Sequence, residues 1–234
     1  LSSSQSIAVA VGNVNEAPTI STSSLSIAEG STAIGTIAAS DPDASSTLSY
    51  TISGTDSSKF SINASSGAVA FLSPPNFESP TDNGLDNTYN FTVTVSDGSL
   101  SSSQSIAVAV GNVNEAPSFS IASAQSYVEN SGATISVAAN DPDASSSLTY
   151  TLSGTDASKF TISSSGVLSF SSAPDYEAPS DSGSNNVFNV SVGVSDGVNS
   201  SSVALVISLT DDTSDNFGIR LPAKVALAEL KKES

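Results

Sequence analysis

The chain lacks four residue types that carry much of protein chemistry: it has no cysteine, histidine, methionine or tryptophan among 234 residues. Without cysteine there is no disulfide framework, no thiolate nucleophile and no cysteine-based zinc or iron–sulfur centre. Without histidine, the usual general base and the usual transition-metal ligand are both missing. Chemistry at any site must come from carboxylates, amides, hydroxyls and backbone, and these hard oxygen ligands suit calcium or magnesium.

Positive charge is also scarce, with 6 Lys plus Arg against 23 Asp plus Glu and a net charge of −17. Nucleic-acid phosphates and anionic membrane surfaces both attract Lys and Arg, so we expect neither partner. No run of residues is long and apolar enough to cross a membrane. No signal peptide is visible and the first residue is not Met, so we expect a piece of a longer mature protein.

The sequence contains a long internal repeat. Leu1–Pro18 reads LSSSQSIAVAVGNVNEAP, and Leu100–Pro117 reads the same at an offset of 99 residues. Similar pairs continue along the chain at 99 or 100 residues, which is typical of a tandem array of domains. We predict the last strand and linker of an upstream repeat at 1–16, repeats at 17–115 and 116–213, and a tail at 214–234.

Within each repeat, apolar residues alternate with small polar ones and turn residues interrupt the pattern. Ile106, Val108 and Val110 alternate with alanines, and shorter runs of the same kind give about seven strands per repeat. This pattern predicts an all-β chain of seven-stranded, immunoglobulin-like Greek-key β-sandwiches in a linear array. The tail differs: Pro222 and the helix formers after it predict a short helix there.

Most acidic residues lie in loops that recur in both repeats. Each repeat has an early glutamate, an Asp-Pro-Asp turn, a glutamate after a proline-rich loop, and an Asp-Gly that closes a strand. A solvated acidic surface does not require such spacing, so the ordered set indicates a site. The recurring acids are Glu29 and Glu129, Asp41, Asp43, Asp141 and Asp143, Glu78 and Glu177, and Asp97 and Asp196.

In this order and at these spacings, the motifs resemble the cadherin repeat in its bacterial cadherin-like form, over about 1–213. That family has a glutamate on the first strand, an Asp-x-Glu loop, an Asp-x-Asn-Asp-type linker, then Asp-x-Asp and a lone Asp in the next repeat. Its calcium ions lie between successive repeats. The resemblance therefore implies Ca²⁺ as the ligand, bound where one repeat joins the next.

Residue by residue, the resemblance implies one complete junction and two partial ones. The complete junction would use Glu29, Asn76 and Glu78 of the first repeat, Asn112, Asn114 and Glu115 of the linker, and Asp141, Asp143 and Asp196 of the second. The partial upstream junction would use Asn15, Glu16, Asp41, Asp43 and Asp97. The partial downstream junction would use Glu129, Asp175, Glu177 and Asp211.

The chain departs from the family pattern at a few positions. Asn76 and Asn112 stand where the family usually has Asp, which would weaken the outer and middle ions of its usual three. Ala116 replaces an Asn that acts through its backbone carbonyl. Thr213 and Ser214 stand where the downstream junction would need Asn and Glu. We expect one to three ions at the complete junction, and the inner position keeps its set: Asn114, Asp141, Asp143 and Asp196.

Three classes of function follow, and the first is preferred. The first is a calcium-rigidified spacer or adhesion segment of a large extracellular, secreted or surface-displayed repeat protein. Its partners would be neighbouring repeats of the same chain, with a homophilic, glycan or protein ligand left open. The second is a polysaccharide- or protein-binding module of a secreted bacterial protein, with a contact surface around Asp82, Asn83, Asp86 and Asn87. The third, an enzyme with paired carboxylates, lacks a nucleophile, and we expect none.

Overall fold

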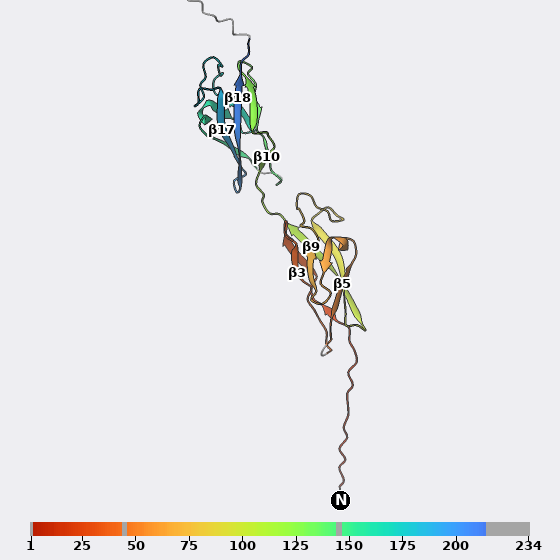
Figure 1. Cartoon of the computed structure of the whole chain (residues 1–234). Coiled ribbons are helices and arrows are strands. Elements are labelled where there is room, and N and C mark those ends of the chain that lie inside the picture. The colour runs from red at the N-terminus through yellow and green to blue at the C-terminus, as the bar shows by residue number, and fades with distance from the viewer. Residues whose placement is uncertain (1, 44–45, 144–146, 214–234) are drawn as a thin grey trace, which may run out of the picture. The chain divides into compact units, whose positions relative to one another are not determined.

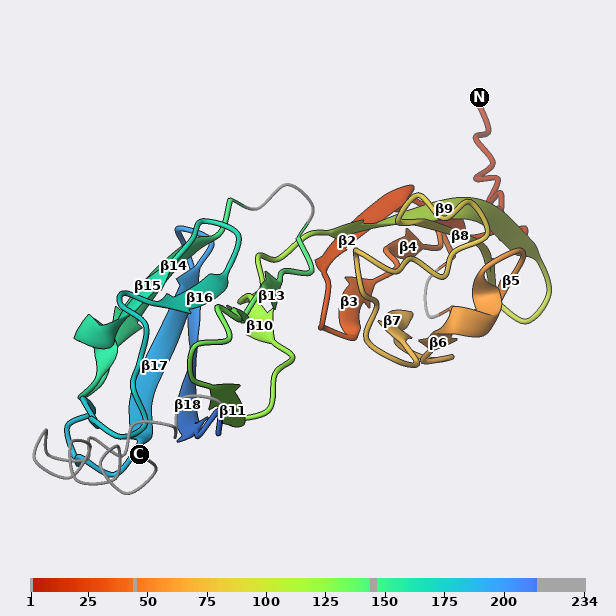
Figure 2. The same cartoon turned by 90° about the horizontal axis from the view of Figure 1, so that it is seen from above.

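A computed structural model describes residues 2–43, 46–143 and 147–213, and these residues form β-strands with two short 3-10 turns. The predicted all-β fold is confirmed, whereas the predicted helix in 214–234 lies outside the described residues. The chain divides into two compact units, unit 1 (Leu1–Val113) and unit 2 (Asn114–Ser234). Each unit is a β-sandwich in its own right, as Figures 1 and 2 show.

Unit 1 contains three sheets. Its segments are β1 (Thr19–Ile20), β2 (Ser24–Ala28), β3 (Ala33–Thr36), β4 (Ala39–Ser40), β5 (Ser49–Ser53), η1 (Ser57–Lys59), β6 (Phe60–Ile62), β7 (Ala68–Phe71), β8 (Thr88–Ser96) and β9 (Ser101–Gly111). One layer is the four-stranded sheet β2-β9-β8-β5, and the other contains β3-β7-β6 beside the short pair β1-β4. Only a few residues separate β1 from β2 and β3 from β4, so the described segments correspond to seven interrupted strands.

The pairing is antiparallel except at one edge, where β2 runs parallel to the long last strand β9. The alternating pattern of the sequence decides which residues enter the core. Ile106, Val108 and Val110 of β9 are 0–5% exposed, as predicted. Opposite them, the ring centroid of Phe60 lies 4.9 Å from that of Phe91, which joins the two layers. Burial of each such side chain contributes about 1.5–3 kcal/mol.

Unit 2 repeats this architecture. Its segments are β10 (Ser118–Phe119), β11 (Ala124–Val128), β12 (Ile135–Ser136), β13 (Ala139–Asn140), β14 (Thr149–Ser153), η2 (Ala157–Lys159), β15 (Phe160–Ile162), β16 (Val167–Phe170), β17 (Val187–Ser195) and β18 (Ser200–Thr210). The sheets are β11-β18-β17-β14, β12-β16-β15 and β10-β13. The long strand β17 pairs with β18 along the full length of β17 (Figure 1).

The two copies of the repeated 18-residue stretch adopt different structures. In β9, the copy at 101–111 lies between β8 and β2. In the copy at 2–12 the structure assigns no strand, and Ile7 and Val9 are each 82% exposed. The alternating sequence is the same, so the strand conformation depends on having two neighbouring strands with which to pair.

Candidate metal centre

The predicted ligands occupy opposite ends of each sandwich, and we name the two groups the cap set and the base set. The cap sets lie beside the hairpin before the last strand: Asn15, Glu16, Asp41, Asp43 and Asp97 in unit 1; Asn114, Glu115, Asp141, Asp143 and Asp196 in unit 2. The base sets lie where the last strand ends: Glu29, Asn76, Glu78 and Asn112 in unit 1; Glu129, Asp175, Glu177 and Asp211 in unit 2. Since β9 has 11 residues, the two ends are about 35 Å apart.

Hydrogen bonds tie the cap set of unit 1 to the segment that precedes β1. The Asp43 carboxylate accepts a hydrogen bond from the Glu16 backbone N–H at 2.8 Å, and a second from the side-chain amide of Asn13. The side-chain amide of Asn15 donates to Asp97 Oδ2 at 2.8 Å. These bonds gather residues from three separate loops at one end of the sandwich.

The cap set of unit 2 has the same arrangement. Asp143 Oδ2 accepts a hydrogen bond from the Glu115 backbone N–H at 2.9 Å. The side-chain amide of Asn114 donates to Asp196 Oδ2 at 2.8 Å, and the Asn114 carbonyl accepts a bond from the side chain of Asn199 at 2.8 Å. The two copies of the repeated sequence therefore adopt one local geometry.

The first aspartate of each Asp-Pro-Asp turn carries an oxygen without a hydrogen-bond donor. Asp41 Oδ1 accepts the Asp43 N–H at 2.8 Å, and Asp141 Oδ1 accepts the Asp143 N–H at 2.9 Å. The other oxygen, Oδ2, is buried in both residues and has no hydrogen-bond partner in the structure. A buried carboxylate oxygen without a donor is costly, and a cation satisfies it. The donor set thus fits a hard divalent ion.

Each base set is built on a glutamate that follows the second strand and is 7% exposed in unit 1 and 1% in unit 2. Glu29 Oε2 accepts the Phe77 N–H at 2.7 Å, and Oε1 accepts the Val113 N–H at 2.8 Å. The Glu29 and Glu78 carboxylates offer oxygens within 4.8 Å of each other. The loop and the end of β9 are thereby held on one buried carboxylate.

In unit 2 the corresponding base set brings three carboxylates together. Oxygens of Glu129, Glu177 and Asp211 all lie within 4.8 Å of one another. Glu129 Oε2 also accepts the Tyr176 N–H at 2.6 Å, and Oε1 accepts the Asp212 N–H at 3.3 Å. Three anions this close repel one another unless a cation lies among them, and carboxylate oxygens are the ligands that calcium prefers.

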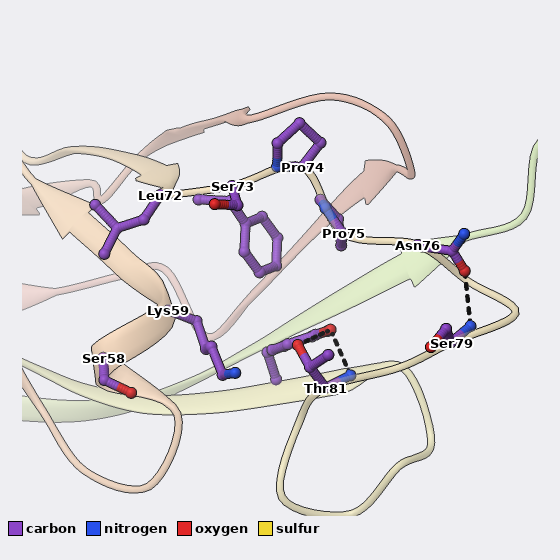
Figure 3. Close-up of a pocket in the computed structure, with 11 residues that line it drawn as sticks. Ser58, Lys59, Leu72, Ser73, Pro74, Pro75, Asn76, Ser79 and Thr81 are labelled. Atoms are coloured by element: carbon purple, nitrogen blue, oxygen red, sulfur yellow. Dashed lines mark hydrogen bonds between the residues drawn. The ribbon is translucent and has the colours of Figure 1, made fainter.

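Some predicted ligands are not directed at these clusters. Asn76 Oδ1 accepts the Ser79 N–H at 2.7 Å, and Asp175 Oδ1 accepts the Ala178 N–H at 3.0 Å, so each side chain closes its own turn. Asn112 follows β9 and is exposed. Asn76 also borders an open hollow of about 700 Å³, whose other wall carries Lys59 (Figure 3).

Within the cap sets, the pKa of Glu16 is raised, whereas those of three aspartates are lowered. Desolvation, and then the nearby Asp43 and Asp41 charges, raise the pKa of Glu16. The Asn13 side chain and the Glu16 N–H lower the pKa of Asp43. The N–H groups of Leu100 and Ser99 lower the pKa of Asp97, and the Asn114 side chain followed by the Val198 N–H lowers that of Asp196. At neutral pH, these cap sets therefore contain clustered negative charge.

Four buried aspartates hold loops, a role that the sequence pattern had not predicted for them. Asp56, Asp82, Asp156 and Asp181 are 2–5% exposed, and all accept backbone N–H groups. Asp82 lies in the loop that the sequence suggested as a contact surface, but its burial rules out a direct contact. A recurring Asp-x-Gly-x-x-Asn pattern, at 82–87 and 181–186, was the signal that could have identified two of them.

Comparisons with known proteins find relatives of this fold. The sequence model of the Cadherin domain family matches residues 23–113, which cover β2 to β9 of unit 1. This match identifies residues 23–113 as a cadherin repeat. No curated protein matches the chain closely enough to add to this.

Solved cadherin structures share the fold of this chain. A crystal structure of human protocadherin-24 EC1-2 is 23% identical, with a TM-score of 0.59 and coverage of 84% of this chain and 100% of that one. Drosophila N-cadherin EC1-4 is 22% identical, with a TM-score of 0.55 and coverage of 84% and 50%. Mouse cadherin-23 EC22-24 is 23% identical, with a TM-score of 0.52 and coverage of 83% and 65%.

The match over residues 23–113 indicates an extracellular adhesion-type module in unit 1. No helix long and apolar enough to cross a bilayer occurs in residues 2–43, 46–143 or 147–213.

Proposed function

We propose that this chain is a calcium-rigidified spacer or adhesion segment of a larger extracellular repeat protein. The observation that carries the proposal is the buried Oδ2 of Asp41 and Asp141, which has no hydrogen-bond partner at the same position of both units. A buried carboxylate oxygen without a donor costs free energy unless a cation or another donor satisfies it. Divalent calcium supplies the missing partner, and the surrounding carboxylate, amide and backbone oxygens are the mixed shell it accepts.

The mechanism is mechanical. The base set of one repeat and the cap set of the next contribute ligands on either side of a short linker, as in the family. When calcium is bound, it offsets repulsion among these carboxylates and joins the two sandwiches. Without calcium, like charges repel and the linker bends. Extracellular calcium modules have Kd values of about 0.1–1 mM, so the sites would fill outside the cell and empty in a cytosol.

Residues 1–16 would serve a preceding repeat of the same kind as its last strand and linker. They are identical in sequence to 100–115, and in this structure Ile7, Val9 and Val11 have no sheet to cover them. The partners of the chain would therefore include neighbouring repeats, with surface ligands reached by the array as a whole. No enzymatic activity is proposed, because clustered carboxylates alone are a weak signal of catalysis.

The alternative, a polysaccharide-binding module, receives less support. Sugar platforms present exposed aromatic rings, and among the described residues Tyr176, at 38% exposure, is the one large aromatic that is exposed. The other tyrosines and phenylalanines that the structure describes pack in or against the cores.

Calorimetric titration with calcium, combined with thermal unfolding in calcium and in chelator, tests the proposal. We expect binding in the millimolar range or tighter and a higher unfolding temperature in calcium, since a ligand that binds the folded state stabilises it. The variant D141N/D143N should lose at least about tenfold in affinity, because charge count tunes calcium sites.

Asp86→Asn is the matched control, since Asp86 is exposed, belongs to neither set, and can keep its bond to the Thr88 N–H as an amide. If the unchanged chain shows neither heat nor a shift in unfolding temperature at 5–10 mM calcium (roughly ten times the expected Kd), the proposal is wrong.

A further inference from the structure

One residue lies between the two loop residues of each base set, and hydrogen bonds hold both its N–H and its carbonyl. In unit 1 this residue is Phe77, which lies between Asn76 and Glu78. Its N–H donates to Glu29 Oε2 at 2.7 Å, and its carbonyl accepts a hydrogen bond from the side-chain amide of Asn87 at 2.8 Å. The first contact comes from a residue that we propose as a ligand, and the second comes from outside both sets.

Unit 2 contains the same clamp with a different central residue. Tyr176 lies between Asp175 and Glu177, and its N–H donates to Glu129 Oε2 at 2.6 Å. Its carbonyl accepts a bond from the side-chain amide of Asn186 at 2.8 Å. The central residue thus changes from phenylalanine to tyrosine, while both hydrogen bonds are kept.

The two asparagines are themselves fixed by three further constraints. Both adopt left-handed backbone conformations, with φ of 64° at Asn87 and 61° at Asn186. The Asn87 N–H donates to buried Asp82 at 3.1 Å, and its carbonyl accepts the Val110 N–H from β9 at 2.9 Å. The amide that reaches Phe77 is therefore anchored to a buried carboxylate and to the last strand.

Asn186 is anchored in the same way. Its N–H donates to Asp181 Oδ1 at 2.8 Å, and its carbonyl accepts the Leu209 N–H at 2.8 Å. Asp181 also accepts the N–H groups of Gly183 and Asn185, so the whole turn closes on one carboxylate.

We propose that Asn87 and Asn186 are positioning residues for the base sets: each fixes the peptide plane that carries Glu78 or Glu177 towards its calcium. This inference rests on the proposed calcium function and names residues outside the ligand set that support it. Rotation of the Phe77–Glu78 peptide would swing the Glu78 side chain, and the hydrogen bond from Asn87 opposes that rotation. Outer partners that orient metal ligands are typically worth 10–100-fold in affinity.

A turn that needed only a left-handed residue would be served equally well by glycine. The side-chain bond to the loop carbonyl is what glycine cannot supply. Asn87→Gly and Asn186→Gly therefore keep the backbone conformation and remove only the side-chain hydrogen bond to the loop carbonyl. Asn87→Asp is the second variant, since it keeps the size of the side chain but places an acceptor against the Phe77 carbonyl.

The matched control is Leu85→Gly in the same turn. Leu85 also has a left-handed backbone, with φ of 53°, and its side chain is 67% exposed. Leu85→Gly therefore makes the same kind of backbone change as Asn87→Gly but leaves the hydrogen bond from Asn87 in place. Two readouts are needed: amide hydrogen exchange in chelator, of residues 76–79 for the Asn87 and Leu85 variants and of residues 175–178 for N186G, and the calcium isotherm. We expect faster exchange and about tenfold weaker calcium binding in N87G, N186G and N87D, with L85G unchanged.

Unchanged exchange and unchanged affinity in folded N87G and N186G would overturn the inference. If N87G fails to fold, N87D and N186G decide the matter by the same two readouts. If the unchanged chain binds no calcium, the proposed calcium function is wrong. If the unchanged chain binds calcium but folded N87G exchanges normally, only the positioning role of Asn87 is rejected. The exchange measurement in chelator separates these cases because it involves no metal.

Discussion

Aspartate has two different roles in this chain, and the groups that each carboxylate accepts distinguish them. Asp82 and Asp181 are 2% and 5% exposed and close loops by accepting backbone N–H groups. Asp97 and Asp196 lie at the rim of the cap sets, where one oxygen closes a turn and the other accepts an asparagine amide. Residue type alone does not separate the two roles, because each depends on which backbone groups the fold brings near.

Acidification should open the loops that Asp82 and Asp181 hold. Burial raises the pKa of both carboxyls, but the N–H groups around them outweigh it and lower the pKa overall. Because the folded pKa is lowered, the stabilisation is present above the usual aspartate value of about 3.9 and is lost as pH falls through the folded value. In chelator, the unfolding temperature should fall between about pH 5 and pH 2.

The double variant D82N/D181N should unfold several degrees lower at pH 6 and lose part of this acid dependence. Replacing an ionised acceptor at a buried site costs about 1–3 kcal/mol. Scanning calorimetry against pH measures both effects, with D86N as the exposed control in the same loop. An acid dependence identical to that of the unchanged chain would contradict the role assigned to these carboxylates.

At the scale of elements, the sequence predicted the strands better than the loops. The alternation of Ile106, Val108 and Val110 requires only that one face be apolar, and the structure buries all three. Among the predicted ligands, hydrogen bonds bring Asn15 to Asp97 and Glu16 to Asp43, whereas Asn76 closes its own turn. The clamp through Asn87 could not be predicted from pattern alone. It depends on a side chain that folds back to a carbonyl ten residues earlier in the sequence.

The repeated stretch marks the limit of such prediction. Residues 2–12 have the same alternation as β9, yet the structure assigns them no strand. Hydrogen bonding between strands is not local, so the same residues form a strand only where β8 and β2 flank them.

This difference gives a prediction with an internal control. Val108→Asp should destabilise unit 1 by about 3–5 kcal/mol, because it places an unpaired charge in a fully buried position. Val9→Asp changes the identical residue of the other copy, which is 82% exposed, and should change stability by less than about 0.5 kcal/mol. Urea unfolding measures both variants. A large loss in V9D would mean that the exposed copy is buried against something in solution.

At the scale of the whole molecule, charge is distributed unevenly. The net charge is −17, and apart from Lys59 and Lys159 all the bases lie in the tail beyond the described residues. The exposed sheet positions are mostly serine and threonine, such as Ser49, Thr51 and Ser53 of β5. The acids instead gather in loops at the ends of each sandwich, where they are close enough to repel one another.

Calcium and simple salt should therefore act differently on the empty chain. Sodium chloride near 1 M shortens the screening length to about 3 Å, so it should raise the unfolding temperature in chelator by a few degrees. Calcium at a few millimolar, on the order of ten times its expected Kd, should exceed this effect because it is coordinated. Magnesium should do less, since it demands tighter octahedral geometry. If sodium, calcium and magnesium chloride raised the unfolding temperature equally at equal ionic strength, screening alone would explain the effect of calcium.

The repeated stretch also determines how such a chain can change length. Any deletion of 99 consecutive residues that begins within Leu1–Pro18 yields one and the same product, because the sequences on both sides of every cut are identical. That product retains a full set of strands, and Asn15-Glu16 takes the place of Asn114-Glu115 ahead of Asp141 and Asp143. Recombination between the copies is therefore in phase with the fold: it removes or adds a whole sandwich and leaves no broken one. The reach of the array can evolve in steps of one domain, with each new linker already carrying its cap residues.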